Sequence, residues 1–236
     1  MHRRGTTTPP PHSHFKRMTV QTILGTAASE FLTAPNHLGH TIRGKGGHDH
    51  IYGGEGDDVL RGGSGDDTIE AFGGNDKIIG GKGNDVVFGD SGNDFIKGKS
   101  GNDELFGGPG FDILKGNRGD DVLYGEDNSD MLSGGWGNDQ LIGDNGNDWL
   151  DGGTGDDQLI GGDGSDVFFL SKGNDIILDY STLEDSRIRI DADVFTEVSL
   201  SVNGAGTLSL MHNHGSTLLM GVDPSSFSMA ENISFV

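Results

Sequence analysis

Between Gly44 and Leu178 the chain repeats one order of apolar and polar positions every nine residues, without an insertion or deletion. The span holds fifteen units, of which Gly53–Arg61, with the sequence GGEGDDVLR, is a regular example. Position 8 of the unit is Ile, Leu, Val or Phe in all fifteen copies, whereas positions 7 and 9 vary widely. Because side chains alternate between the two faces of a strand, we expect positions 7–9 to form a short strand whose position 8 points inward.

One apolar side chain in nine residues is too little to form the core of an isolated unit. Stacked units join these side chains into a continuous ladder, so the repeat predicts a solenoid. Glycine fills position 4 in fourteen units and position 1 in thirteen, which predicts a turn over positions 1–6. Position 5 is Asn or Asp in eleven units, and these residues also tolerate left-handed backbone. On the same ground we expect Asn128 to replace a position 4 glycine.

The pattern weakens on the N-terminal side of the repeats. Residues 18–43 contain degenerate units, in which Glu30 and His40 stand where the regular unit has Asp. Terminal repeats of solenoids are atypical because they cap the stack, and we assign residues 18–43 to that role. Residues 1–17 are polar and proline-rich, which predicts a disordered tail.

A different pattern follows the last unit. In residues 179–236 glycine becomes scarce, and strand-like segments at 197–202, 207–211 and 216–220 are separated by turn sequences. This spacing predicts an antiparallel β-meander. We expect it to form a cap, because the open end of a solenoid exposes unpaired strand edges.

Acidic residues far outnumber basic ones. The 236 residues include 37 Asp and Glu but only 16 Lys and Arg, for a formal net charge of −21. A field of that sign repels nucleic acid and attracts cations, and a compact state needs a counter-charge. The absence of Cys excludes thiolate metal sites, and no apolar run approaches the ~20 residues of a transmembrane helix. We therefore expect neither a nucleic-acid partner nor a membrane span.

The most regular polar residue is the Asp at position 6, which is present in all fifteen units. It lies beside glycine-rich turns that expose backbone carbonyls. Carboxylate and carbonyl oxygens are the ligands of hard cations, and irregular loops suit Ca²⁺ better than Mg²⁺, which requires a stricter octahedron. The candidate metal ligands are Asp49, Asp58, Asp67, Asp76, Asp85, Asp94, Asp103, Asp112, Asp121, Asp130, Asp139, Asp148, Asp157, Asp166 and Asp175.

The unit Gly-Gly-x-Gly-x-Asp-x-apolar-x resembles the hemolysin-type calcium-binding repeat of the RTX family over residues 44–178. The resemblance implies an all-β fold, a right-handed parallel β-roll with two sheets and two units per turn, followed by an antiparallel β cap. It also implies that calcium lies between turns stacked on the same side, so that Asp58 shares an ion with Asp76. Fifteen units leave seven such gaps on one side and six on the other, hence up to about 13 Ca²⁺.

The C-terminal region is similar to the same family. Asp179-Tyr180 and Arg187–Ile190 resemble the closing segment of RTX modules, and Glu231–Val236 resembles the ending of type I secretion substrates. The resemblance implies a secreted, extracellular protein that a type I transporter exports and that folds on binding calcium. We expect it to be a monomer. The alternative interpretation of Glu231–Val236 is a last strand of the cap.

The sequence holds no catalytic constellation, and we expect no enzyme activity. There is no Ser/His/Asp set, phosphate loop, dinucleotide fingerprint or His-Glu-x-x-His helix. Paired acids such as Asp57-Asp58 recur at the repeat spacing, which favours ion binding over a unique active site. We interpret Asp90 and Asp144, at position 2, as solvated turn residues. We interpret three histidine pairs as structural: His37 and His40, His48 and His50, and His212 and His214.

Two other functions stay open at this point. RTX proteases, lipases and epimerases carry such rolls beside catalytic domains, so one alternative is the C-terminal calcium-binding and secretion module of such an enzyme. Only 43 residues precede the repeats here, which speaks against it. The other alternative is a surface or adhesive protein that binds through the outer faces of the roll. Outward positions 7 and 9 mix basic, acidic and apolar residues without a flat ligand-like pattern.

Overall fold

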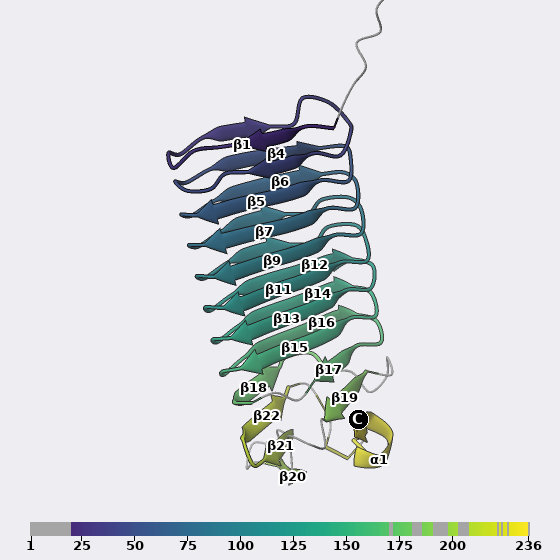
Figure 1. The fold of residues 1–236 in the computed structure, drawn as a ribbon. Coiled ribbons are helices and arrows are strands. Elements are labelled where there is room, and N and C mark those ends of the chain that lie inside the picture. The colour runs from purple at the N-terminus through teal and green to yellow at the C-terminus, as the bar shows by residue number, and fades with distance from the viewer. Residues whose placement is uncertain are drawn as a thin grey trace, which may run out of the picture.

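The computed structural model describes residues 20–169, 172–180, 186–190, 198–202, 208–220, 222, 224–225 and 227–235. Within them the chain coils into a parallel β-roll, and successive strands alternate between two sheets that run down the molecule (Figure 1). Neighbouring strands of a sheet pair with a shift of 18 residues, as in Val59 with Lys77, so two nonapeptides form one turn. The parallel β-roll expected from the resemblance is therefore confirmed.

The two sheets have 11 and 12 strands, and we call them sheet A and sheet B. Sheet A contains β1 (Thr22–Leu24), β3 (Thr41–Arg43), β5 (Val59–Ser64), β7 (Lys77–Lys82), β9 (Phe95–Ser100), β11 (Ile113–Arg118), β13 (Met131–Trp136), β15 (Trp149–Thr154), β17 (Val167–Phe169), β19 (Arg187–Ile190) and β23 (Ile233–Phe235). Sheet B contains β2 (Phe31–Thr33), β4 (His50–Gly54), β6 (Thr68–Phe72), β8 (Val86–Phe88), β10 (Glu104–Phe106), β12 (Val122–Asp127), β14 (Gln140–Asn145), β16 (Gln158–Asp163), β18 (Asn174–Ile177), β22 (Gly215–Leu219), β21 (Leu208–His212) and β20 (Val198–Val202).

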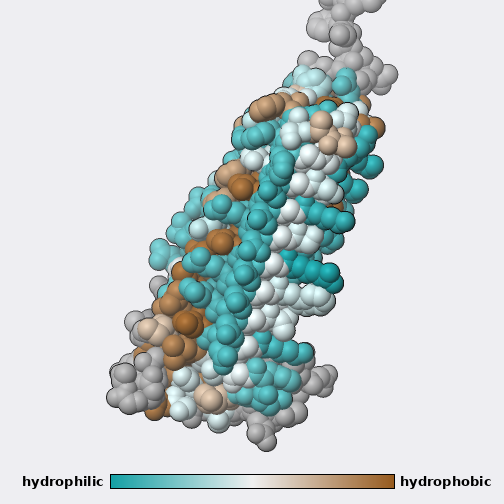
Figure 2. Space-filling view, turned by 90° about the vertical axis from the view of Figure 1, so that its left-hand side faces the viewer, coloured by the Kyte–Doolittle hydropathy of each residue, from teal (hydrophilic) through white to brown (hydrophobic). Residues whose placement is uncertain are grey.

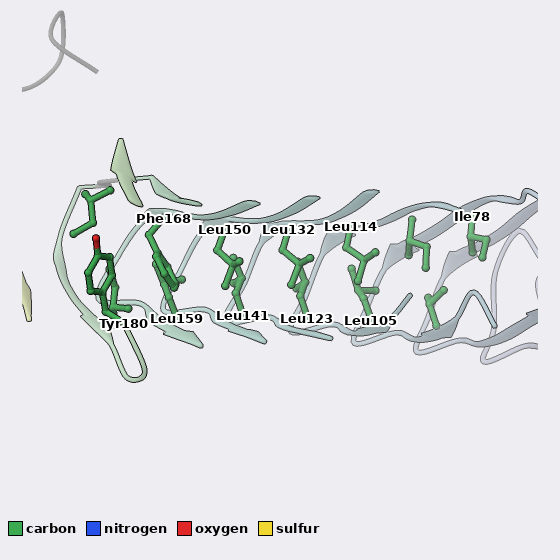
Figure 3. Packing of buried hydrophobic residues seen from close by; sticks show 14 of the residues in the cluster. Ile78, Leu105, Leu114, Leu123, Leu132, Leu141, Leu150, Leu159, Phe168 and Tyr180 are labelled. Carbon is green, nitrogen blue, oxygen red and sulfur yellow. The ribbon is translucent and has the colours of Figure 1, made fainter. Parts of the chain in front are cut away.

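The position 8 residues form the core, as the alternation of the strands predicts. Their side chains are no more than 2% exposed from Ile51 to Ile177. Figure 3 shows the two rows of this ladder facing one another across the roll, with Leu114 and Leu132 on one side and Leu105 and Leu123 on the other. Each residue packs against equivalents from neighbouring turns, so no single turn has a core of its own.

The strands are longer than the sequence analysis predicts. Nine of them, such as β5, have six residues and run from position 7 of one unit to position 3 of the next. The prediction of a turn over positions 1–6 was wrong, because the turn proper occupies positions 4–6. Position 1 is buried inside the strand, where glycine leaves room for other groups rather than a change of direction.

Two positions of the unit adopt the left-handed backbone. Position 4 does so at most glycines and at Asn128, where φ is 79°, so the predicted exchange of Asn for Gly is confirmed. Position 2 also has positive φ, and there the residue is often not glycine: φ is 72° at Phe72, 61° at Asp90 and 75° at Glu126. The sequence analysis missed the positive φ at position 2, because the residues there vary and many are not glycine. For such residues a positive φ is energetically unfavourable.

The C-terminal region extends both sheets and closes the core. The predicted meander is confirmed as antiparallel strands β20, β21 and β22, and β22 pairs in parallel with β18. Tyr180 is 4% exposed at the end of the ladder, next to Phe168 (Figure 3), and its ring also contacts that of Phe227. The short helix α1 (Met229–Asn232) leads into β23, which pairs with β19. In the described part of the chain, no helix is long and apolar enough to span a bilayer.

Candidate calcium-binding columns

The position 6 Asp residues form two columns, one along each edge of the roll where the turns between the sheets stack. All fifteen are at most 2% exposed, which is exceptional for a carboxylate. In each column the residues follow one another at intervals of 18, so the structure brings together the pairs that the resemblance implies, such as Asp58 with Asp76. Burying an ionised carboxylate is costly unless it is paired or coordinates a metal.

One oxygen of each carboxylate has a fixed hydrogen-bonding role. The backbone N–H of Asp85 donates to Oδ1 of Asp103 at 2.8 Å, and the N–H of Asp103 donates to Oδ1 of Asp121 at 2.7 Å. The same bond recurs turn after turn on both edges, at 2.6–3.2 Å from Asp49 and Asp58 onward. These bonds fix the orientation of the carboxylates but satisfy only half of each group.

The other oxygen lacks a hydrogen-bond donor in most of these residues. Oδ2 is buried and without a donor in thirteen of the Asp residues, from Asp49 to Asp157. It points toward the position 1 glycine of its own unit: a Cβ added to Gly107 would lie 2.6 Å from Oδ2 of Asp112 and 2.8 Å from the carbonyl oxygen of Gly125 in the next turn. A carboxylate and a carbonyl oxygen thus converge on a space that exists because position 1 lacks a side chain.

This arrangement fits Ca²⁺, a hard cation that binds six to eight oxygens in flexible geometry. No three His, Cys, Asp or Glu side chains in the described residues come close enough to hold a metal by themselves. An ion here would therefore take one or two Asp oxygens and complete its shell with the carbonyls of the glycine-rich turns. The donor set contains no sulfur or imidazole, so it suits calcium better than a transition metal.

Without a cation the columns are electrostatically unfavourable. Burial raises the pKa of Asp76, Asp103 and Asp130 to about 8, against the partial compensation of one backbone N–H bond each. The neighbouring carboxylates of the same column raise these pKa values further. Burial also raises the pKa of Asp85, Asp94, Asp139, Asp148 and Asp157 to about 7. The fold therefore favours protonated carboxylates at neutral pH unless a metal replaces the protons.

The columns end where Asp is replaced. At the N-terminal end the backbone N–H of Glu30 donates to Asp49 Oδ1 at 2.9 Å, and that of His40 donates to Asp58 Oδ1, so both residues occupy the Asp position as predicted. The ring of His40 lies 3.6 Å from Asp58 and is buried. At the other end Asp166 donates its N–H to the hydroxyl of Ser186 at 3.2 Å instead of to a carboxylate.

A second ladder runs beside each column and was missed in the sequence analysis. The side-chain oxygen of position 5 accepts the backbone N–H of position 5 one turn later, as from Asn84 to Asp66 and from Asn102 to Asn84, at 2.8 and 2.9 Å. The positive φ values fall at positions 2 and 4 rather than at 5, so left-handed backbone does not explain the Asn and Asp there. The preference for Asn and Asp at position 5, both short side chains with an acceptor oxygen, was the feature of the sequence that could have predicted this ladder.

The histidine pairs and the acidic residues at position 2 were the other candidates in the sequence, and the structure shows no metal site at them among the residues that it describes. His48 accepts the N–H of Asp66 at 2.9 Å, and so fills the same place in the position 5 ladder. Burial lowers the pKa of His212, and no group of metal-ligating side chains includes a histidine among the described residues. Asp90 and Asp144 are exposed at position 2, as expected, although their left-handed backbone was not.

Two buried carboxylate columns on a parallel two-sheet coil define this chain as a cation-binding β-roll. The family model of the RTX calcium-binding nonapeptide repeat matches it in four copies, at residues 41–69, 70–105, 106–141 and 142–177. The chain belongs to the RTX calcium-binding repeat family, which confirms the resemblance seen in the sequence. No curated protein matches it.

Three solved structures are similar to parts of the chain. The AlgE6R3 and AlgE6R2 subunits of the mannuronan C5-epimerase from Azotobacter vinelandii are 29% and 25% identical, cover 49% and 48% of this chain and 77% and 91% of their own, and give TM-scores of 0.40 and 0.36. The extracellular lipase LipA from Serratia marcescens is 17% identical over 80% of this chain and 40% of its own, with a TM-score of 0.36. At these TM-scores the similarities carry no argument for a shared activity.

The geometry of the columns predicts unequal roles for two acidic residues. Asp103→Asn keeps an acceptor at Oδ1 but removes the charge between the turns of Asp85 and Asp121, so binding should fall by about two ions per chain. Asp90→Asn is the matched control, because Asp90 is exposed and Asn tolerates its φ of 61°. Calcium bound per chain, measured by equilibrium dialysis, checks this. Equal losses in both variants would contradict the assignment of position 6.

The raised pKa values also predict how the metal-free roll responds to pH. A carboxyl group whose pKa is higher in the fold than in the unfolded chain stabilises the fold at low pH, and this stability is lost as pH rises through about 6 to 8. Calcium-free protein, prepared with a chelating resin, should therefore show more β signal by circular dichroism at pH 5.5 than at pH 8. Identical spectra at the two pH values would show that the columns are not buried as described.

Proposed function

We propose that this RTX chain is a secreted, non-enzymatic calcium-binding protein whose roll folds when Ca²⁺ neutralises the Asp columns. The observation that carries the proposal is the row of buried Oδ2 atoms without a hydrogen-bond donor, in thirteen of the fifteen Asp residues. Each is a charged group that the protein itself leaves uncompensated, and RTX repeats bind calcium. The ligands are the fifteen position 6 residues from Asp49 to Asp175, with up to about 13 ions between successive turns.

Folding and binding are one event in this account. Each site takes oxygens from turns 18 residues apart, so it does not exist in the unfolded chain. Where calcium is scarce, a net charge of −21 keeps the chain expanded, and an expanded chain suits passage through a type I transporter. In a calcium-rich extracellular medium the ions favour the roll by mass action.

The first test is calcium removal. With calcium chelated at pH 8 the full chain should lose most of its β signal in circular dichroism, and should regain it at roughly 10⁻⁴–10⁻³ M calcium. Trp149, which is 40% exposed and lies 5.7 Å from the ring of Phe169, provides a second readout by fluorescence. Magnesium at the same concentration is the control and should restore little. A chelated sample with the complete β spectrum would contradict coupled folding.

The second test concerns export. Residues 233–235 form β23, so removing the C-terminal residues could damage the fold as well as remove a secretion signal. The experiment must separate these two effects. A chain lacking residues 231–236 should no longer be exported by a co-expressed type I transporter. Leu219→Asp is the control: Leu219 is buried in β22, so this variant should fold poorly yet still be exported. Normal export of the truncated chain would show that residues 231–236 are not a secretion signal.

A further inference from the structure

The two sheets carry opposite charge. The strands of sheet A contain ten basic residues and only one acidic one, Asp151; the basic ones are Arg43, Arg61, Lys77, Lys82, Lys97, Lys99, Lys115, Arg118, Arg187 and Arg189. The strands of sheet B contain no Lys or Arg. Their acidic residues outside the calcium column are Glu70, Glu104, Glu126, Asp127, Asp144 and Asp163.

This separation is invisible when the units are read in sequence order. Consecutive units contribute their strands to opposite sheets. Basic and acidic residues that alternate along the chain therefore lie on different faces of the roll. The sequence analysis considered the outward positions of all units together, and so did not separate the charges of the two faces. The calcium columns do not require the separation either, because they lie along the turns and take their side-chain ligands from position 6 alone.

Each outer face also carries a column of five apolar side chains on five consecutive strands. On sheet A these occupy position 7 and are Phe95, Ile113, Met131, Trp149 and Val167, beside a groove of about 370 Å³. On sheet B they occupy position 9 and are Phe88, Phe106, Tyr124, Ile142 and Ile160. The rings of Phe88, Phe106 and Tyr124 stack with centroids 4.8 Å apart. Figure 2 shows hydrophobic residues gathered in a band along one margin of the roll, beside the hydrophilic turns.

The two apolar columns lie at the same height on the roll. Phe88 and Phe95, at which they begin, are seven residues apart, and so are Ile160 and Val167, at which they end, whereas a full turn takes 18 residues. The charges overlap in height too: Lys77 and Lys97 on sheet A are level, within a turn, with Glu70 and Glu104 on sheet B. The apolar column and the acidic residues of sheet B therefore lie at the same heights along the roll as the apolar column and the basic residues of sheet A. Two copies placed side by side would bring them into contact.

We propose that calcium-loaded copies of this chain associate side by side, with sheet A of one copy on sheet B of the next and both rolls pointing the same way. Charge complementarity between the faces selects the partner, and the matched apolar columns fix its height. The contact joins two different surfaces and leaves one free on each copy, so it is heterologous and continues as open rows. The monomer expected from the sequence would then be present only at low protein concentration.

Sedimentation velocity of the full chain at saturating calcium tests the proposal. The sedimentation coefficient should rise with protein concentration at low salt and return to that of the monomer in about 1 M NaCl, where charges are screened within ~3 Å. Circular dichroism at each salt concentration shows that the roll itself is intact. A monomer at every concentration in low salt would overturn the proposal.

Charge reversal identifies the faces. The double variants Lys77→Glu/Lys97→Glu and Glu70→Lys/Glu104→Lys change outward residues that take no part in the calcium columns. Each alone should weaken association roughly tenfold or more, because like charges then face one another. Mixing the two in equal amounts should restore it, since each copy then finds an oppositely charged face on both sides.

The matched control is Glu55→Lys/Glu231→Lys, in which two exposed acids outside the strands of both sheets, in the turn after β4 and in α1, are reversed. This variant should associate like the parent. Loss of association in the control, or failure of the mixture to recover, would show that net charge rather than the two faces governs the contact. Loss in only one of the two variants would show that sheet A and sheet B do not contact one another, and would equally overturn the proposal.

Discussion

The burial of like-charged carboxylates in two continuous columns is the constraint on which the rest of the structure depends. Each Asp accepts a backbone N–H from the preceding turn, and in thirteen of them the second oxygen is buried with no donor. The hydrogen bond compensates part of the buried charge, but the second oxygen makes the ionised group costly to bury without a counter-charge. Burial raises the pKa of Asp76, Asp103 and Asp130 to about 8, so at these positions the fold favours a proton or a metal ion on the carboxylate.

The requirement for that ion explains why the unit looks as it does. Position 1 is glycine in thirteen units, where a Cβ would occupy the space on which the carboxylate and carbonyl oxygens converge. The turns are short and expose their carbonyls, and position 5 ties them together from the outside. What remains for a hydrophobic core is one side chain per unit, at position 8. The ladder from Ile51 to Ile177 is continuous but narrow, so we infer that the roll depends on its ions as much as on its core.

The sequence was sufficient to predict what repeats identically in every unit. The invariant Asp and the apolar position 8 predicted the columns and the ladder, and Glu30 and His40 predicted how one end departs from them. Features that depend on how units combine were less accessible. The length of β5 beyond position 9 comes from pairing 18 residues away, and the left-handed backbone at Asp90 is not indicated by the type of residue there. The charge of the two faces appears only after odd and even units are assigned to different sheets.

Locating the ions in a crystal tests whether the Asp columns bind calcium. Crystals of the calcium-loaded chain should give anomalous difference density in two rows, each peak between successive turns and in contact with Oδ2 of a position 6 Asp. The ladder of apolar residues between the rows should show none, and neither should the exposed acids at position 2, such as Asp90 and Asp144. Peaks confined to those exposed acids, or rows of Asp residues without any peak, would contradict the account.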